Sequence, residues 1–331
     1  MDEFAAQPLT QLTRPAMATE WEILLPYPAP PAWTDAAAVA LEQIGHWESR
    51  LSSYLPNSEL SRINRSAYEQ AIKLDGELWQ LFDEALQAWR ITEGAYDLTA
   101  GPLIDAWGIA KRAQRRPPDS ELADLRERVG SQHLLLDPAA HTIRFARPGI
   151  QLNPGGIGKG FALDRAARSL KLAPVTDFLF HGGQSSVLAR GRQQAQWRGW
   201  QIALRHPRDE RRRLGSIMLC DSALATSGCG RQFFHLDGQR HGHVLDPRTA
   251  WPAETDLMSL TVICRSAAMA DALATGLFVL GLDRASQIAA RLSPPLGLIA
   301  VTAGGREGDV RLHVQDLPAG CSFQSNDVSE T

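Results

Sequence analysis

The chain has 331 residues, of which 44% are hydrophobic and 21% are charged, a balance that predicts a globular, soluble protein. The net charge of −3 gives no reason to expect nucleic acid or a membrane surface as a main partner, and no apolar run is long enough to span a bilayer. The four cysteines form no C-x-x-C pair and the N-terminus shows no signal peptide, so we expect a cytoplasmic protein with reduced thiols and no structural zinc site.

Hydrophobic periodicity predicts several long helices among short strands. The helices are expected at about residues 35–53, 76–92, 158–172, 267–280 and 285–292, and strands at about 20–25, 133–136, 142–145, 178–180, 186–189 and 200–204. Strands in hairpin-like succession, interrupted by helices, indicate an α+β fold with a largely antiparallel sheet and packed helices. We expect one domain over residues 17–317, a flexible lead over 1–16, a frayed tail over 318–331 and a surface loop over 111–118.

A glycine-rich stretch, Asn153–Ala166, opens directly into the helical pattern that starts at Gly158. Glycines let a backbone come close to a ligand, and a helix N-terminus offers free N–H groups and partial positive charge. With Lys159 adding a full charge, the stretch could bind a phosphate or another anion. It is neither the phosphate loop of nucleotide hydrolases nor G-x-G-x-x-G. The alternative is a tight loop before an ordinary helix.

A carboxylate lies in an otherwise apolar helical segment. Asp271 and Thr275 are spaced i, i+4 and share one face of that helix, while most neighbouring residues are apolar. A buried carboxylate needs a partner, because burying an unpaired charge is very costly. That partner could be an arginine, backbone N–H groups, or a hard cation such as Mg²⁺, which carboxylate and hydroxyl oxygens suit.

A second polar cluster joins Thr226 and Ser227 to a following segment with His243, Asp246 and Arg248. Such residues could hold phosphates and supply a proton acceptor. The alternative is a β-turn with polar caps, built on the Asp-Pro pair at residues 246–247.

Seven motifs follow one another along the chain. They are residues 54–64 (YLPNSELSRIN), 92–99 (TEGAYDLT) with 101–103 (GPL) and 107–108 (WG), 155–160 (GGIGKG) with Asp164, 181–183 (HGG), 225–228 (ATSG), 243–249 (HVLDPRT) and 270–275 (ADALAT). In this order and spacing they resemble the ApbE family of FAD:protein FMN transferases, over roughly residues 17–300. The resemblance implies a single T-fold-like α+β domain that binds its substrate FAD in a cleft beside Mg²⁺. Such enzymes cleave the FAD pyrophosphate, attach FMN to a Thr or Ser hydroxyl in the acceptor motif of a target flavoprotein, and release AMP.

The resemblance also implies roles for individual residues. Asp271, Thr275 and the backbone carbonyl of Gly158, where the family usually has Ala, match metal ligands. Lys159 would steady phosphate charge, and His243 is the candidate for proton transfer or phosphate contact, so the catalytic group is His243, Asp271 and Lys159. The residues expected near FAD are Tyr54, Asn64, Glu93, Gly155, Gly156, Lys159, Asp164, Thr226, Ser227, His243 and Arg248.

The chain departs from the family pattern at four places. Ala18 replaces Gly in Met-Gly-Thr, Asn153-Pro154 replace Asp-Leu before the glycine loop, Gln184 replaces Asp after Gly-Gly, and Cys229-Gly230 stand where an aromatic often follows Ser-Gly. These departures leave two alternatives to the transferase: a non-catalytic FAD-binding or carrier protein, and a Mg²⁺-dependent FAD pyrophosphatase that yields FMN and AMP.

Overall fold

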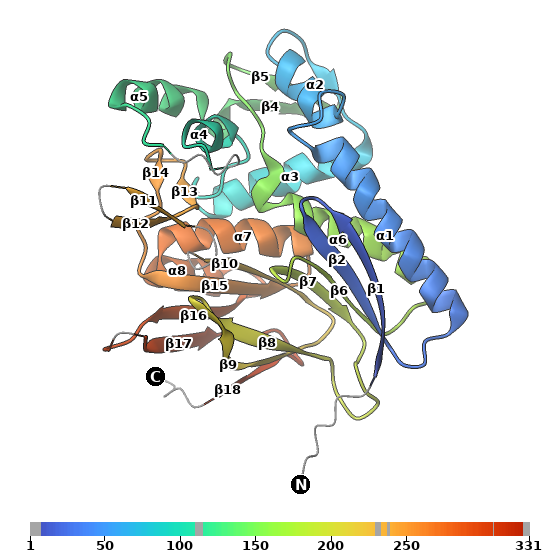
Figure 1. The fold of residues 1–331 in the computed structure, drawn as a ribbon. Coiled ribbons are helices and arrows are strands. Elements are labelled where there is room, and N and C mark those ends of the chain that lie inside the picture. The colour runs from blue at the N-terminus through green and yellow to red at the C-terminus, as the bar shows by residue number, and fades with distance from the viewer. Residues whose placement is uncertain (1–7, 110–114, 229–232, 237–238, 307, 327–331) are drawn as a thin grey trace.

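The computed structural model describes residues 8–109, 115–228, 233–236, 239–306 and 308–326 (Figure 1). Its centre is an eight-stranded sheet in which every neighbouring pair is antiparallel. In spatial order the strands are β1 (Leu9–Ala16), β2 (Thr19–Pro26), β6 (Phe178–Gly182), β7 (Ser186–Arg190), β10 (Ala223–Gly228), β15 (Leu257–Cys264), β16 (Gly297–Ala303) and β17 (Val310–Gln315). The predicted α+β fold with a largely antiparallel sheet is confirmed.

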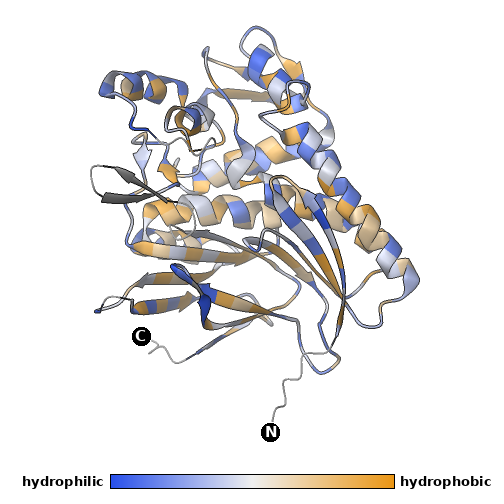
Figure 2. Cartoon of the chain, viewed as in Figure 1, coloured by the Kyte–Doolittle hydropathy of each residue, from blue (hydrophilic) through white to orange (hydrophobic). Residues whose placement is uncertain are grey.

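Helices cover one face of this sheet. Helices α6 (Gly158–Leu172) and α7 (Ala267–Leu280) pack on the strands, α1 (Pro31–Leu51) packs on α6, and α3 (Gly76–Ile91) packs on α7, while α8 (Leu282–Arg291) follows α7 (Figure 1). Figure 2 shows hydrophobic residues gathered along α7 and the strands beside it. Among the helices of the described residues, none is long and apolar enough to cross a membrane.

The other face of the main sheet is also buried. A three-stranded sheet of β8 (Trp200–His206), β9 (Asp209–Leu219) and β18 (Ser322–Ser325) packs there. Strand β16 shows the consequence: Leu298 and Ala300 join the core on the helical side, whereas Ile299 and Val301 join the core under the second sheet. Because alternate residues of a strand point to opposite faces, a strand buried on both faces is apolar throughout.

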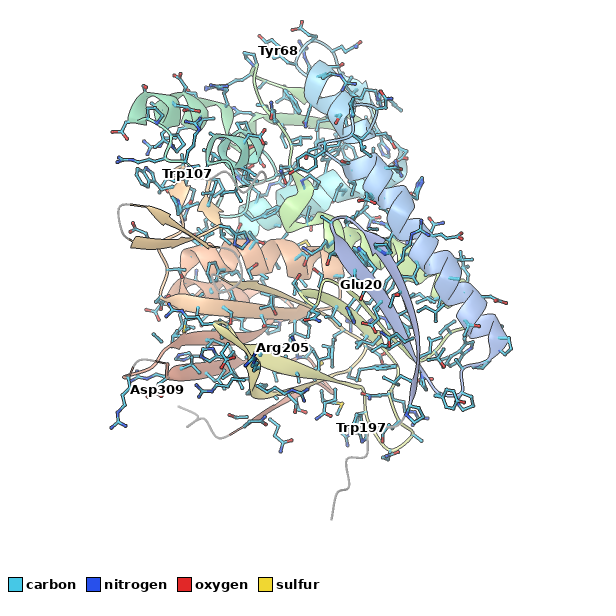
Figure 3. The ribbon with its side chains drawn as sticks, in the orientation of Figure 1. Glu20, Tyr68, Trp107, Trp197, Arg205 and Asp309 are labelled. Carbon is cyan, nitrogen blue, oxygen red and sulfur yellow. The ribbon has the colours of Figure 1, made fainter. Side chains whose placement is uncertain are left out.

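A smaller lobe lies beyond α3. Its elements are α2 (Glu59–Ser66), α4 (Gly101–Ala106), α5 (Asp119–Arg128), a sheet of β3 (Ile72–Lys73), β5 (Thr142–Phe145) and β4 (Leu134–Asp137), and the pairs β11 (Phe233–Leu236) with β12 (Gln239–Gly242) and β13 (Leu245–Asp246) with β14 (Trp251–Pro252). Trp107, the residue after α4, contacts the β13–β14 segment within this lobe (Figure 3). Its indole N–H donates to the Ala250 carbonyl at 3.0 Å, and its ring meets the edge of Trp251.

Two sequence-based expectations about the chain's periphery are wrong for the described residues. Residues 9–16 are not a flexible lead but form β1, which pairs with β2 along its whole length. Residues 322–325 are not a frayed tail, because they pair with β9 as β18. Both are edge strands with mostly polar residues, and backbone hydrogen bonds join them to their sheets. Because few of their residues are apolar, hydrophobic patterning does not predict them. Helix α5 follows directly after the predicted loop and was not predicted at all.

Candidate active site

The site is built where the first turns of α6 and α7 cross. Gly160 makes the crossing possible: a Cβ on this residue would lie 1.9 Å from the carbonyl oxygen of Ala267. With only hydrogen at that position, the Gly160 N–H reaches Asp271 on α7 and donates to its Oδ2 at 2.6 Å. The first N–H groups of a helix have no partner within the helix, so Asp271 caps α6.

The capping is reciprocal. Asp164, on α6, accepts hydrogen bonds at the start of α7 from the backbone N–H of Ala267 and Ala268, at 3.1 and 3.0 Å, and from the Ser266 hydroxyl at 2.9 Å. Asp164 was expected near FAD. All three of these hydrogen bonds come from the start of α7, so the structure gives Asp164 the role of a helix cap. Burial raises its pKa above the usual value, and these hydrogen bonds oppose that rise.

Asp271 is the buried carboxylate of the site, with 6% of the residue exposed. Besides the Gly160 N–H, it accepts a hydrogen bond from the Ser186 hydroxyl, which reaches Oδ1 at 2.6 Å. Burial raises the pKa of Asp271, while the Lys159 ammonium and the two hydrogen bonds lower it, and burial outweighs them. Of the partners considered for this carboxylate, the structure therefore shows a backbone N–H and a hydroxyl.

Hydroxyl groups line the neighbouring positions. Thr275 Oγ1 donates to the Asp271 carbonyl at 3.1 Å and lies 3.3 Å from Ser227 Oγ. The position of a Cβ on Gly156 would be 3.3 Å from the same Thr275 oxygen, so the glycine loop passes directly over it. Thr226, the residue before Ser227 on β10, shares a 2.8 Å hydrogen bond with Thr261 on β15. The structure thus brings Asp271, Thr275, Ser227 and the glycine loop together, as predicted from separate motifs.

These groups fit a hard cation. Each Asp271 oxygen accepts one of the two hydrogen bonds described above and keeps further acceptor capacity. Carboxylate and hydroxyl oxygens are ligands that Mg²⁺ accepts, and Mg²⁺ is usually held by one or two carboxylates together with substrate phosphates. Among the described residues, no group of three or more His, Cys, Asp or Glu side chains could hold a metal alone, so the substrate would have to complete the coordination. Gly158 is the first residue of α6, and the role of its carbonyl as a metal ligand remains a prediction.

A model of the ApbE family matches residues 17–299. The chain belongs to the ApbE family. It is 32% identical over 264 residues to the FAD:protein FMN transferase of Haemophilus influenzae, covering 78% of this chain and 76% of that protein. The Vibrio cholerae protein of the same name is 31% identical over 301 residues, with coverages of 89% and 88%. Among solved structures, the apo flavinyl transferase ApbE of Pseudomonas stutzeri superposes with a TM-score of 0.80 at 27% identity, covering 95% of this chain and 96% of that one.

The ApbE glycine loop is held from its N-terminal side. Asn64 brackets the backbone of Leu152, accepting from its N–H at 2.8 Å and donating to its carbonyl at 3.2 Å. Asn153 then caps the 3₁₀ turn Pro154–Gly156 by accepting from the Gly155 N–H at 2.8 Å. Asn64 was expected near FAD, and its two amide atoms are engaged in positioning the loop. The N–H groups of Gly155 and Gly160 are therefore both engaged within the protein.

A further ApbE motif group lies at the end of α3. Gly94, two residues beyond the C-cap Thr92, has φ +81°, and its Cβ position is 3.7 Å from Cγ of Arg248. Arg248 forms a bidentate ion pair with Asp246, at 2.9 and 2.7 Å, and Glu93 is paired with Arg284 on α8. Arg248 and Glu93 were both expected near FAD, and their contacts with FAD remain predictions.

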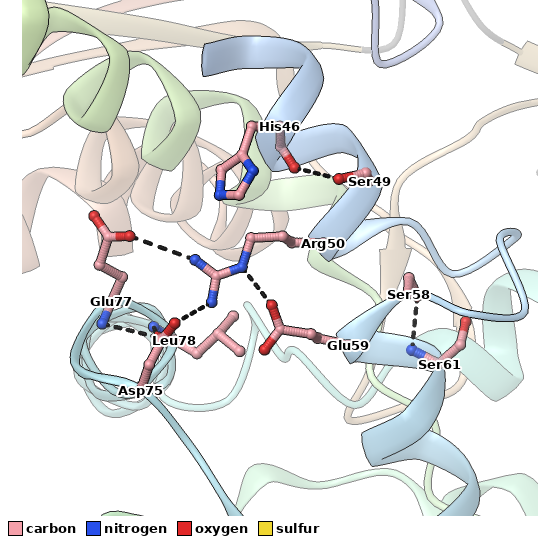
Figure 4. Close-up of polar contacts among 9 residues, drawn as sticks. All are labelled: His46, Ser49, Arg50, Ser58, Glu59, Ser61, Asp75, Glu77 and Leu78. Atoms are coloured by element: carbon pink, nitrogen blue, oxygen red, sulfur yellow. Dashed lines mark hydrogen bonds and ion pairs between the residues drawn. The ribbon is translucent and has the colours of Figure 1, made fainter.

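The motif that begins at Tyr54 is fixed by a buried guanidinium (Figure 4). Arg50, with 9% of its side chain exposed, pairs with Glu59, Asp75 and Glu77 and so joins α1, α2 and α3. A pocket of about 400 Å³ lies beside it, lined by Ser49, Arg50, Leu55, Pro56, Asn57, Ser58 and Glu59. Tyr54 is 70% exposed, and its contact with FAD remains a prediction.

Two more residues, His243 and Ser186, bear on the sequence-based predictions. His243 lies half-buried between β12 and β13, and its role in proton transfer remains a prediction. Ser186 was not predicted, because it is 85 positions from Asp271 and begins an apolar strand. A lone serine at a strand start carries no signal that would single it out.

Proposed function

We propose that the protein is a Mg²⁺-dependent FAD:protein FMN transferase. The observation that carries this proposal is the buried Asp271 carboxylate at the crossing of α6 and α7, beside the Thr275 hydroxyl and the glycine loop. Relatives with this named activity match over most of the chain. The acceptor is a Ser or Thr hydroxyl of a target flavoprotein, which we expect to meet the enzyme in the cytoplasm.

In the reaction, the acceptor oxygen attacks the phosphorus on the FMN side of the pyrophosphate. A new P–O bond joins FMN to the protein, the P–O bond to AMP breaks, and the acceptor proton passes to a base, for which His243 is the candidate. Asp271 and Thr275 would hold Mg²⁺, which would neutralise charge on the pyrophosphate and the leaving AMP. The Lys159 ammonium lies close enough to Asp271 to lower the pKa of that carboxyl. The same positive charge can attract phosphate oxygens.

Two of the departures from the family pattern fall on turns, which is compatible with a working enzyme. Ala18 has φ +56° in the β1–β2 hairpin and Gln184 has φ +65° in the β6–β7 hairpin. Left-handed backbone favours Gly, Asn and Asp, so these replacements add turn strain. Asn153 still provides the cap oxygen that Asp would provide. Cys229-Gly230 lie outside the described residues.

The test incubates purified protein with FAD, Mg²⁺ and a peptide carrying a Ser/Thr-Gly-Ala-Thr-like acceptor, and measures AMP by chromatography and covalent flavin by mass spectrometry. AMP in equal amount to flavinylated peptide is expected. AMP with free FMN would show a pyrophosphatase instead, and retained FAD without AMP would show a binding protein.

The variant Asp271→Asn tests the metal assignment. An amide keeps one oxygen for the Gly160 N–H and can donate to Ser186, so the variant should fold, but it loses the charge that a cation needs. We expect Mg²⁺-dependent turnover to fall at least about a hundredfold, the scale of losing one strong electrostatic group. The matched control is Asp283→Asn, an exposed aspartate on α8. Unchanged AMP release by Asp271→Asn would refute the assignment.

A further inference from the structure

A tyrosine hydroxyl is buried against the site without a partner. Tyr96 is 3% exposed, and its Oη has no hydrogen-bond partner among the residues that the structure describes. The residue follows the C-terminus of α3, where its backbone N–H donates to Thr92 Oγ1 at 3.0 Å. This bond and the surrounding core fix the ring in place.

One edge of the ring lies against the glycine loop. A Cβ on Gly156 would lie 3.1 Å from Tyr96 Cε2 and 3.5 Å from Cδ2, so the edge next to the hydroxyl-bearing carbon is the closer one. The same Cβ position is 3.3 Å from Thr275 Oγ1. Burial raises the pKa of the Tyr96 phenol well above its usual value, and the charges of Asp97 and Asp271 add to this rise. The phenol therefore stays a neutral O–H donor beside Gly156, Thr275 and Asp271.

An unpartnered buried hydroxyl needs an explanation. Leaving one unsatisfied costs about 1–3 kcal/mol, whereas phenylalanine would fill the same space without that cost. A ligand oxygen that accepts a hydrogen bond from the Tyr96 hydroxyl would explain why this hydroxyl has no partner within the described protein. A neutral O–H donor would suit an oxygen that carries negative charge or is polarised by a cation.

We propose that Tyr96 is a ligand-binding residue whose hydroxyl donates a hydrogen bond to an oxygen held between the glycine loop and α7. This inference rests on the proposed function, since the oxygen belongs to the FAD pyrophosphate or to a water on the metal. Tyr96 thereby adds a donor at a place where the N–H groups of Gly155 and Gly160 are already engaged.

The test is Tyr96→Phe, with Tyr68→Phe as the control, since Tyr68 is 41% exposed on the far lobe (Figure 3). Thermal unfolding without ligands should show Tyr96→Phe at least as stable as the wild type, because the unsatisfied hydroxyl is gone. Calorimetry should show a Kd for FAD, with Mg²⁺ present, raised about five- to twentyfold, the effect of losing one hydrogen bond to a charged group. Tyr68→Phe should leave both unchanged.

Repeating the FAD titration without Mg²⁺ identifies which oxygen accepts. A loss of FAD affinity only when Mg²⁺ is present would assign the hydrogen bond to a metal-bound water, and an equal loss with and without Mg²⁺ would assign it to a phosphate oxygen. If the wild type binds FAD and Mg²⁺ and Tyr96→Phe binds both within twofold, the inference is wrong while the proposed function stands. If the wild type binds neither, the proposed function fails and this inference fails with it.

Discussion

Glu84 provides a direct test of the electrostatics between α3 and α6. Its side chain is 17% exposed, one oxygen has no hydrogen-bond partner among the described residues, and Arg165 lies at 3.8 Å. Burial and the charge of Asp164 raise its pKa from 4.5 to about 7, against the opposing effects of Gln80 and Arg168, while Asp83 adds to the rise. The folded state binds the Glu84 proton more tightly than the unfolded state does. The contribution of this proton to the free energy of unfolding is therefore fully present below about pH 4.5 and is lost as the pH rises toward 7.

The magnitude follows from the shift. A rise from 4.5 to about 7 corresponds to about 3 kcal/mol, and water at the partly accessible carboxyl reduces this to about 1–2 kcal/mol. We therefore expect Glu84→Gln to unfold in urea with a free energy about 1–2 kcal/mol above the wild type at pH 8, and with no such gain at pH 4.5. Glu69→Gln, at an exposed position, is the control. Parallel pH curves for Glu84→Gln and the wild type would refute the reasoning.

Three further changes test the packing around the site. Arg50→Met should lower the free energy of unfolding by about 2–4 kcal/mol, because Glu59, Asp75 and Glu77 lose their common cation. The loss is limited because these carboxylates are about a third to a half exposed. Urea unfolding that shows no lower free energy would contradict a stabilising ion-pair network. Gly160→Ala should cost about 3 kcal/mol or more, because its Cβ would meet the Ala267 carbonyl, and a variant as stable as the wild type would rule out the close crossing. Ala18→Gly should raise stability by about 0.5 kcal/mol by relieving the left-handed turn, and a lower melting temperature would argue against strain there.

The elements that the sequence predicts best are those with a strong local signal. The predicted helices at residues 158–172 and 267–280 match α6 and α7, because long apolar periodicity and a clear start mark both. Strands β1 and β18 were missed for the opposite reason: what holds them is pairing with β2 and β9, which local patterning does not report. The start of α1 at Pro31 was also placed too late, although proline suits the first helical position.

The site shows a similar division. The motifs identify Asp271, Thr275 and Ser227 individually, and the resemblance joins them, but the partners of each side chain depend on residues far away in the chain. Asp271 meets Gly160 from 111 positions away, and no local pattern announces that contact. Ser186 and the unpartnered Tyr96 hydroxyl likewise become visible only when the crossing of the helices is known.

The glycine-rich stretch shows that the close approach which glycine allows need not be to a ligand. At Gly160 the neighbour that comes close is the backbone of α7. The reciprocal caps Asp164 and Asp271 then use N–H groups that an anion would otherwise bind. Under the proposed function, we therefore expect a pyrophosphate at this crossing to depend on Lys159 and a cation for the charge that these N–H groups do not supply.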